Sequence, residues 1–138
     1  SGDSTVPVLE ELAGRGIKVN VTAVFSLQQT QDVLPVLRDS EAIISVFAGR
    51  LFDIGRDAVV DTREISQVVH DESNCKSLWA SPRMSYDYKN AATAKCDIIT
   101  MSAVLIKKLK LFGKTPGEYS LDTVKMFYGD AVASGYTL

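Results

Sequence analysis

Residues 42–50 read AIISVFAGR, and this short run indicates an α/β protein. It opens with a nearly unbroken apolar stretch, which is typical of a parallel strand buried on both faces. Ser45 interrupts the stretch, and Gly49 and Arg50 follow where the strand should end. Polar residues at such a strand end are typical of α/β proteins, whose strand ends and following loops face the ligand.

Three further segments have the same character. The full set of predicted strands is residues 17–25, 42–47, 77–80 and 97–101. A helix is expected before the first strand, capped by Ser4 or Thr5 and ended by Gly16. Apolar residues at helical spacing predict helices over residues 27–37, 58–70, 86–94, up to about 111, and 121–133, with a polar loop after residue 47.

The alternation of strands and helices predicts a parallel sheet with right-handed crossovers. Four strands suit either a small open sheet or half of a (β/α)8 TIM barrel. Length alone favours the open sheet, because a complete barrel needs about 250 residues. The polar strand ends favour the half-barrel, as one partial domain over residues 1–138. Its βα units would occupy residues 1–111, and a closing loop and helix residues 112–138.

Composition excludes several classes of protein. The 138 residues are 46% hydrophobic, which is enough for a real core. A net charge of -2 without a basic run argues against nucleic acid as a partner. No apolar run approaches the roughly 20 residues that span a bilayer, and no signal peptide is visible. Cys75 and Cys96 are interpreted as a pair of buried reduced thiols, with a disulfide or metal pair as the alternative, and a cytoplasmic protein is expected.

The first strand carries two polar residues near its carboxyl end. Asn20 and Thr22 are two positions apart, so both side chains should project to one side of the strand. Polar groups on an inward face need a ligand or bound water. A hydrogen-bonded structural pair is the alternative.

The second and third strands end in hydroxyls and guanidinium groups. Ser45 and Phe47 should share a face, and Gly49 should let the backbone turn so that Arg50 reaches over the mouth of the barrel. Ser81 and Arg83 close the third strand in the same manner. Two arginines with a nearby serine suit bidentate phosphate binding, although a single strand-end arginine is usually a surface cation.

Four segments resemble the fifth to eighth strand regions of transaldolases, a (β/α)8-barrel group of class I aldolases. They read GIKVNVTAVFS, ISVFAGRLFDIGRD, LWASPR and CDIITMSAVLIKKL, and the preceding STVPVLEELAGRG resembles the fourth helix of that family. In the family, the fourth strand carries the lysine that forms a Schiff base with the sugar ketone. The resemblance therefore implies the carboxyl-terminal half of the barrel, without that lysine.

The resemblance also implies roles for individual residues. Asn20 corresponds to the asparagine that hydrogen-bonds the substrate near the imine carbon, and Thr22 to the threonine that helps to hold the catalytic water. Ser45 corresponds to a contact with a substrate hydroxyl. Phe47 stands where related fructose-6-phosphate aldolases have tyrosine, which indicates dihydroxyacetone transfer instead.

Arg50, Ser81 and Arg83 correspond to the phosphate clamp of the family. Pro82 departs from the aromatic residue usual between that serine and arginine, which puts the angle of Arg83 in doubt. No lysine of this chain is predicted at the barrel mouth, because Lys18, Lys76 and Lys95 all fall at strand beginnings. The chain alone is therefore expected to be inactive.

The resemblance implies a transferase of the pentose phosphate pathway that acts on fructose 6-phosphate, sedoheptulose 7-phosphate and erythrose 4-phosphate. No cofactor and no metal is expected. The partner would be the amino-terminal half-barrel or a second copy of the chain, because open strand edges promote association, and a homo-oligomer is expected. The alternatives are a non-catalytic half-barrel that binds phosphate or self-associates, and cleavage like that of fructose-6-phosphate aldolase.

Other residues receive structural interpretations. His70, the only histidine, is expected to be solvated at a helix end. Asp53 and Asp57 are expected to order the loop after residue 50. Trp79 is expected in the core of the barrel or of the helix interface, and Met126 is expected to fill the core.

Overall fold

The structure is a computed structural model and describes residues 4–135 of the chain. Its sheet has four parallel strands in the order β1-β2-β3-β4, so each strand pairs with the next one along the chain. A doubly wound sheet would reverse its strand order at a switch point, whereas a barrel does not. The chain therefore has the α/β architecture of half a (β/α)8 barrel, as predicted. The strands are β1 (Asn20–Val24), β2 (Ile43–Val46), β3 (Lys76–Trp79) and β4 (Ile98–Ile99).

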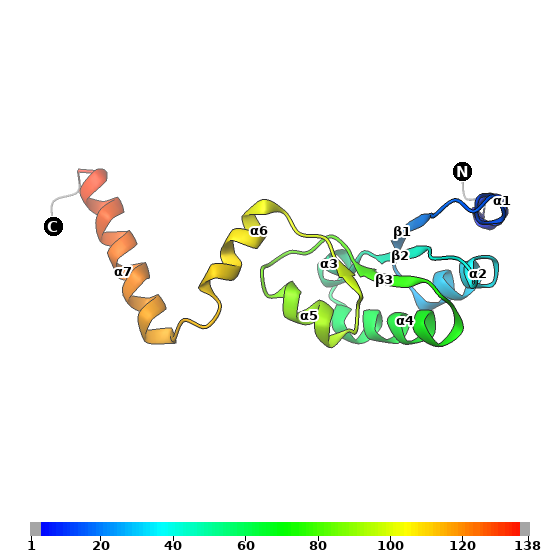
Figure 1. Cartoon of the computed structure of the whole chain (residues 1–138). Coiled ribbons are helices and arrows are strands. Elements are labelled where there is room, and N and C mark those ends of the chain that lie inside the picture. Colours follow the sequence, from blue (N-terminus) through cyan, green and yellow to red (C-terminus); the bar gives the residue numbers. More distant parts are fainter. Residues whose placement is uncertain (1–3, 136–138) are drawn as a thin grey trace.

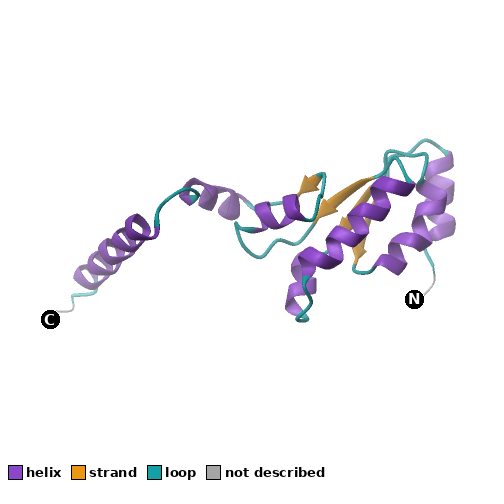
Figure 2. Ribbon diagram, turned by 90° about the horizontal axis from the view of Figure 1, so that it is seen from below, coloured by secondary structure: helices purple, strands orange, loops and turns teal. Residues whose placement is uncertain are grey.

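The helices gather on one face of this sheet. Figures 1 and 2 show α2, α4 and α5 lying on the same side of the strands, with α1 beside α2. This arrangement is the one that right-handed crossovers produce when they all wind the same way. The helices are α1 (Val6–Gly14), α2 (Leu27–Leu37), α3 (Ala48–Asp53), α4 (Ala58–Glu72), α5 (Asp87–Thr93), α6 (Ala103–Lys108), the 3-10 turn η1 (Leu109–Leu111) and α7 (Pro116–Ala133).

The core lies between the sheet and these helices. Trp79 is completely buried and packs at 6.1 Å, ring centre to ring centre, against Phe52 of α3, which confirms it as a core residue. Ile44 and Val46 of β2 and Leu37 of α2 are equally inaccessible to solvent. Side chains alternate along a strand, so Ser45, between Ile44 and Val46, faces the other side of the sheet. The predicted site lies on that side.

Local signals explain where the helices begin. The Ser26 hydroxyl accepts the Gln29 N–H, and the Gln29 side chain accepts the Ser26 N–H, so α2 begins with a capping box at the predicted position. Asp57 accepts the first free N–H groups of α4, which confirms its role in ordering this region.

Two expectations about the secondary structure are wrong. The segment after β2 is the helix α3 and not a polar loop, so Gly49 and Arg50 are helical. The last helix begins at Pro116, five residues earlier than predicted, because the Thr115 and Glu118 side chains form a capping box there.

The C-terminal arm, residues 102–135, projects from the rest of the described chain, residues 4–101, which we call the body (Figure 1). No residue of α6 or α7 is buried, and Figure 2 shows α7 standing apart from the sheet and its helices. Met126 is 54% exposed, so its interpretation as core filler is wrong within this chain. Phe127 and Tyr128 are also exposed, and α7 therefore has an uncovered apolar surface.

His70 is exposed in the last turn of α4, as expected, but it also has a partner. Its Nε2 lies 2.8 Å from Asp97 Oδ2 and ties the end of α4 to the start of β4. Burial alone would raise the pKa of Asp97, but hydrogen bonds from His70 and from the Ser77 N–H outweigh it and leave this pKa below its ordinary value. Cys75 and Cys96 are free thiols, as predicted. No helix in the described range, residues 4–135, is long and apolar enough to cross a membrane.

Candidate functional site

Asn20 and Ser45 meet on neighbouring strands, although Asn20 is the first residue of β1 and pairs in register with Ile43 at the start of β2. The expectation that Asn20 lies near the carboxyl end of its strand is therefore wrong. The Ser45 hydroxyl donates a hydrogen bond of 2.6 Å to Asn20 Oδ1, and the Ser45 side chain is almost completely buried. The pairing satisfies the hydroxyl without a ligand, which agrees with a structural role for Ser45. Asn20 itself is exposed, and its amide N–H groups have no partner among residues 4–135. The Asn20 amide can therefore donate to a bound molecule.

Thr22 lies in a different local environment. The pairing of β1 with β2 shifts between Val21 and Val24, and Ala23 in this bulge has a φ of 59°. No hydrogen bond in the described part of the chain joins Thr22 to Asn20 or Ser45. Thr22 instead lines a hollow of about 220 Å³ beside the start of α1 and residues of α2.

The ring of Phe47 supports Arg50. Phe47 lies at the junction of β2 and α3, and the Arg50 guanidinium stands 5.2 Å from its ring centre. The opposite neighbour of the ring is Phe25, at 5.7 Å between ring centres. A cation over an aromatic face is held by the charge distribution of the ring, so Arg50 has a defined orientation although it is exposed.

Gly49 is required for a different reason from the predicted one. It has no left-handed backbone and makes no turn, because it lies inside α3. A Cβ atom at this position would stand 1.6 Å from the carbonyl oxygen of Ser81. The glycine therefore allows the backbone at the end of β3 to touch α3 directly.

Because of this close approach, the Arg83 side chain contacts α3, the helix that carries Arg50. Arg83 Nε donates to the Gly49 carbonyl oxygen at 3.3 Å and to Asp53 Oδ1 at 3.1 Å, and Arg83 Nη2 pairs with Asp53 Oδ2. Ser81 has a φ of 59°, an uncommon conformation for a residue with a side chain. The structure thus places Arg83 and the Ser81 backbone against α3, the helix that carries Arg50.

Sequence reasoning missed Asp87, which holds the loop that carries Arg83. Asp87 is completely buried, and its Oδ2 accepts the N–H groups of Arg83 at 2.6 Å and of Met84 at 3.0 Å. Its Oδ1 accepts the Asn90 side chain at 3.0 Å. A carboxylate just after a strand-end turn and at the start of a helix is the signal that could have found it.

A second hollow borders Ser81 but neither Arg50 nor Arg83. It measures about 220 Å³ and lies between the ends of β3 and β4, where the chain turns into α6. Ser81 forms one wall and Ser102, which caps α6, forms another. Ser81 therefore borders an open space between the ends of the last two strands.

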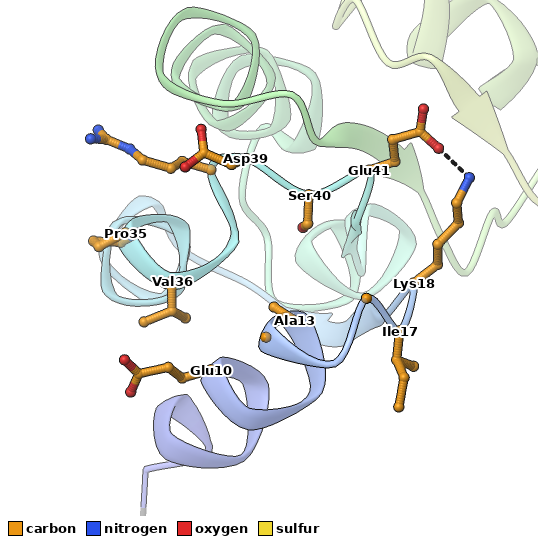
Figure 3. A pocket seen from close by; sticks show the side chains of 12 residues that line it. Glu10, Ala13, Ile17, Lys18, Pro35, Val36, Asp39, Ser40 and Glu41 are labelled. Atoms are coloured by element: carbon orange, nitrogen blue, oxygen red, sulfur yellow. Dashed lines mark hydrogen bonds and ion pairs between the residues drawn. The ribbon is translucent and has the colours of Figure 1, made fainter.

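A larger hollow lies at the opposite end of the strands. Figure 3 shows it between α1 and α2, where Lys18 and Glu41 form an ion pair near its rim. It measures about 520 Å³, and none of the predicted site residues lines it. The hydrogen bond from Lys18 holds the pKa of Glu41 below its ordinary value. This hollow is separate from Ser45 and from the loops after β2 and β3 that carry the arginines.

Comparison with known families identifies a family for this chain. The sequence model of the family described as "Transaldolase/Fructose-6-phosphate aldolase" matches residues 2–134. The chain belongs to this family. The match includes all four strands and the C-terminal arm up to residue 134, so the membership applies to the body and the arm alike.

Individual relatives of the transaldolase family give the same assignment. A "probable transaldolase" of Lactiplantibacillus plantarum is 36% identical over 113 residues, which cover 75% of this chain and 50% of that protein. A protein of the same description from Thermus thermophilus is 34% identical over 72% of this chain and 44% of its own length. A third, from Herpetosiphon aurantiacus, is 31% identical over 73% and 45%. The chain spans about half the length of these relatives.

Proposed function

We propose that this chain is the phosphate-binding half of a transaldolase-type enzyme. The enzyme would transfer a dihydroxyacetone unit between sugar phosphates through a lysine Schiff base, with the lysine supplied by a complementary half-barrel. The observation that carries the proposal is that α3, directly after β2, carries Arg50 and is contacted by Arg83 and by the Ser81 backbone. Membership of the family supports it.

The two arginines and the serine would bind the phosphate of the sugar. Guanidinium groups donate to phosphate oxygens in pairs, and the Ser81 hydroxyl can add a further donor. A phosphate held far from the reacting carbon contributes binding energy that positions the sugar chain at the lysine. Pro82 restricts the backbone between Ser81 and Arg83, and Asp87 holds this backbone by accepting the Arg83 N–H.

Asn20 and Thr22 of β1, and Phe47 just after β2, would contact the reacting part of the sugar. The free amide N–H groups of Asn20 would donate to a substrate oxygen near the imine carbon, with the amide oxygen oriented by Ser45. Thr22 would help to hold the water that transfers a proton. Phe47 would provide an apolar surface where a tyrosine hydroxyl would otherwise engage that water, which favours transfer over cleavage.

The lysine would come from outside this chain, because none of its lysines described by the structure is suitably placed. Lys76 is the first residue of β3, and Lys95 lies just before β4. Lys18 pairs with Glu41 at the opposite end of the strands (Figure 3). A Schiff-base lysine must reach the substrate at the carboxyl ends of the strands and lose its proton there. The isolated chain is therefore proposed to be inactive.

The complementary half would pair with the edges of the sheet. Among residues 4–135, β1 and β4 each pair with one strand, so their outer backbone groups would be available for further strands. The domain would then be one barrel, with residues 1–111 as βα units and residues 112–138 as a closing element. The exposed apolar surface of α7 would be covered in that assembly or by a neighbouring subunit of a homo-oligomer.

A non-catalytic half-barrel that binds phosphate or self-associates is the second candidate. The specific observation that favours it is the combination of a formed arginine cluster with two unpaired sheet edges in a chain without a suitably placed lysine. Aldolase-like cleavage of fructose 6-phosphate is a variant of the first candidate, because the family description includes both activities.

Borohydride trapping with fructose 6-phosphate distinguishes these candidates. Hydride reduces the imine between lysine and ketone to a stable secondary amine, which intact mass spectrometry detects as a dihydroxyacetone adduct. We expect an adduct when this chain is combined with a complementary half-barrel, on the complementary part only. The absence of any adduct would favour the non-catalytic candidate, and an adduct on this chain would contradict the assignment of its lysines.

A further inference from the structure

The guanidinium of Arg83 is held on one edge only. Nε and Nη2 face Asp53, and Nε also shares its hydrogen with the Gly49 carbonyl oxygen. A guanidinium has five N–H donors, of which these contacts use two. The two donors of Nη1 and the second donor of Nη2 have no partner among residues 4–135. The outer edge of the fork is therefore free to bind an anion.

We infer that Asp53 is a positioning residue that aims this free edge of Arg83 at the phosphate of the substrate. The inference rests on the proposed function, because it concerns the same phosphate clamp. Asp53 lies at the end of α3 and Arg50 lies in the same helix, so one rigid element places both arginines. Loss of the Asp53 carboxylate would leave Arg83 tethered by the Gly49 carbonyl alone.

Geometry favours positioning over competition between Asp53 and the ligand. A competing carboxylate would occupy the donors that the phosphate needs, and Arg83 would have to leave it before binding. Here the carboxylate takes the Nε edge, while the edge of Nη1 and Nη2 remains available for a second bidentate contact. Both side chains are about half exposed, at 41% for Arg83 and 51% for Asp53, so water weakens their direct attraction. The main contribution of the pair is therefore the orientation of the fork.

A lysine could not replace Arg83 in this arrangement. An ammonium group is a single point of charge without a fixed edge, so Asp53 would have no orientation to impose. The effect of Asp53 on phosphate affinity should consequently depend on arginine at position 83. This dependence separates positioning from a general change in charge.

The test is the dissociation constant for inorganic phosphate, measured by isothermal titration calorimetry on the purified full chain. We expect Asp53→Asn to weaken binding by about three- to tenfold, because an untethered arginine must be ordered by the ligand. Asp53→Glu, which keeps the carboxylate at a longer reach, is expected to lie between Asp53→Asn and the unchanged protein. In an Arg83→Lys background, Asp53→Asn should change the constant by less than about twofold.

Asp61→Asn is the matched control. Asp61 holds Arg56 by the same bidentate geometry, at 2.6 Å and 2.7 Å, on the neighbouring helix α4 and away from Arg83. Asp61→Asn removes the same negative charge as Asp53→Asn, but phosphate affinity should stay within about twofold of the unchanged protein. Circular dichroism of each variant shows whether the fold is retained, and the Arg83→Lys pair provides a second comparison if Asp53→Asn alone is poorly folded.

The outcomes separate the inference from the proposed function. Tighter phosphate binding by Asp53→Asn would identify Asp53 as a competitor and overturn the inference, and so would an equal loss in Asp61→Asn. Phosphate binding that survives Arg83→Ala unchanged would overturn the clamp itself and the inference with it. If Arg83→Ala abolishes binding while Asp53→Asn has no effect, the clamp stands and only the positioning role fails.

Discussion

Helices α2 and α7 begin with the same local device but end in different environments. Ser26 and Gln29 form a capping box at the start of α2, and Thr115 and Glu118 form one at the start of α7. α2 buries Thr30, Val33, Leu34 and Leu37 against the body, whereas α7 buries none of its residues. Capping and helical spacing therefore produce a helix in both places, but only contact with the sheet and its helices produces a core.

Alanine substitution of one helical glycine in the body and one in the arm should give the largest difference in stability between the two regions. Gly49→Ala places a Cβ atom against the Ser81 backbone and should destabilise the protein by about 3 kcal/mol. Gly129 of α7 has no atom near its potential Cβ, so Gly129→Ala should stabilise that helix by about 1 kcal/mol. Urea unfolding followed by circular dichroism measures both effects. Destabilisation of similar size by Gly129→Ala would show that α7 packs closely against another surface.

Loss of a single carboxylate charge gives a smaller contrast. Asp87→Asn replaces a buried acceptor of two backbone N–H groups and should destabilise the body by about 2 kcal/mol. Asp122→Asn removes an exposed partner of Lys114 in the arm and should change stability by less than about 0.5 kcal/mol. Urea denaturation at neutral pH measures both. Equal effects would contradict the assignment of Asp87 as the residue that holds the Arg83 loop.

Removal of the two caps should give the smallest and most local effects. Ser26→Ala and Thr115→Ala each remove a capping hydroxyl, at a cost of about 1 kcal/mol to the helix concerned. The loss at Ser26 should appear in the global unfolding free energy, because α2 is part of the core. The loss at Thr115 should appear only as faster amide hydrogen exchange in α7. Global destabilisation by Thr115→Ala would show that the arm and the body unfold together.

Much of the fold could be predicted because its signals are local. The bounds of α2 agree with the prediction, and all four strands lie within or beside the predicted segments. α3 was missed because nothing in the sequence near Gly49 reveals that the Ser81 backbone lies against it. The contact of His70 with Asp97 was missed for a similar reason, since Asp97 lies in another part of the fold.

The sequence could predict which residues belong to the candidate site, but not which of them contact one another. Asn20, Ser45, Arg50, Ser81 and Arg83 were recognised because polar residues at the ends of apolar strands are conspicuous. The roles of Asp53 and Asp87 depend on where Arg83 and its backbone lie in space. Neither role leaves a pattern that spacing along the chain would reveal.

Periodicity and turn residues predict the alternating α/β pattern, polar strand ends favour the half-barrel, and four short motifs in order carry the family resemblance. They suffice because each depends on residues that are neighbours in the chain. The tertiary structure decided that Ser45 satisfies Asn20, that Ser81 rests on Gly49 and that Asp53 holds Arg83. Each of these contacts joins separate elements of the fold, and their approach depends on how the helices pack on the sheet and not on local preference.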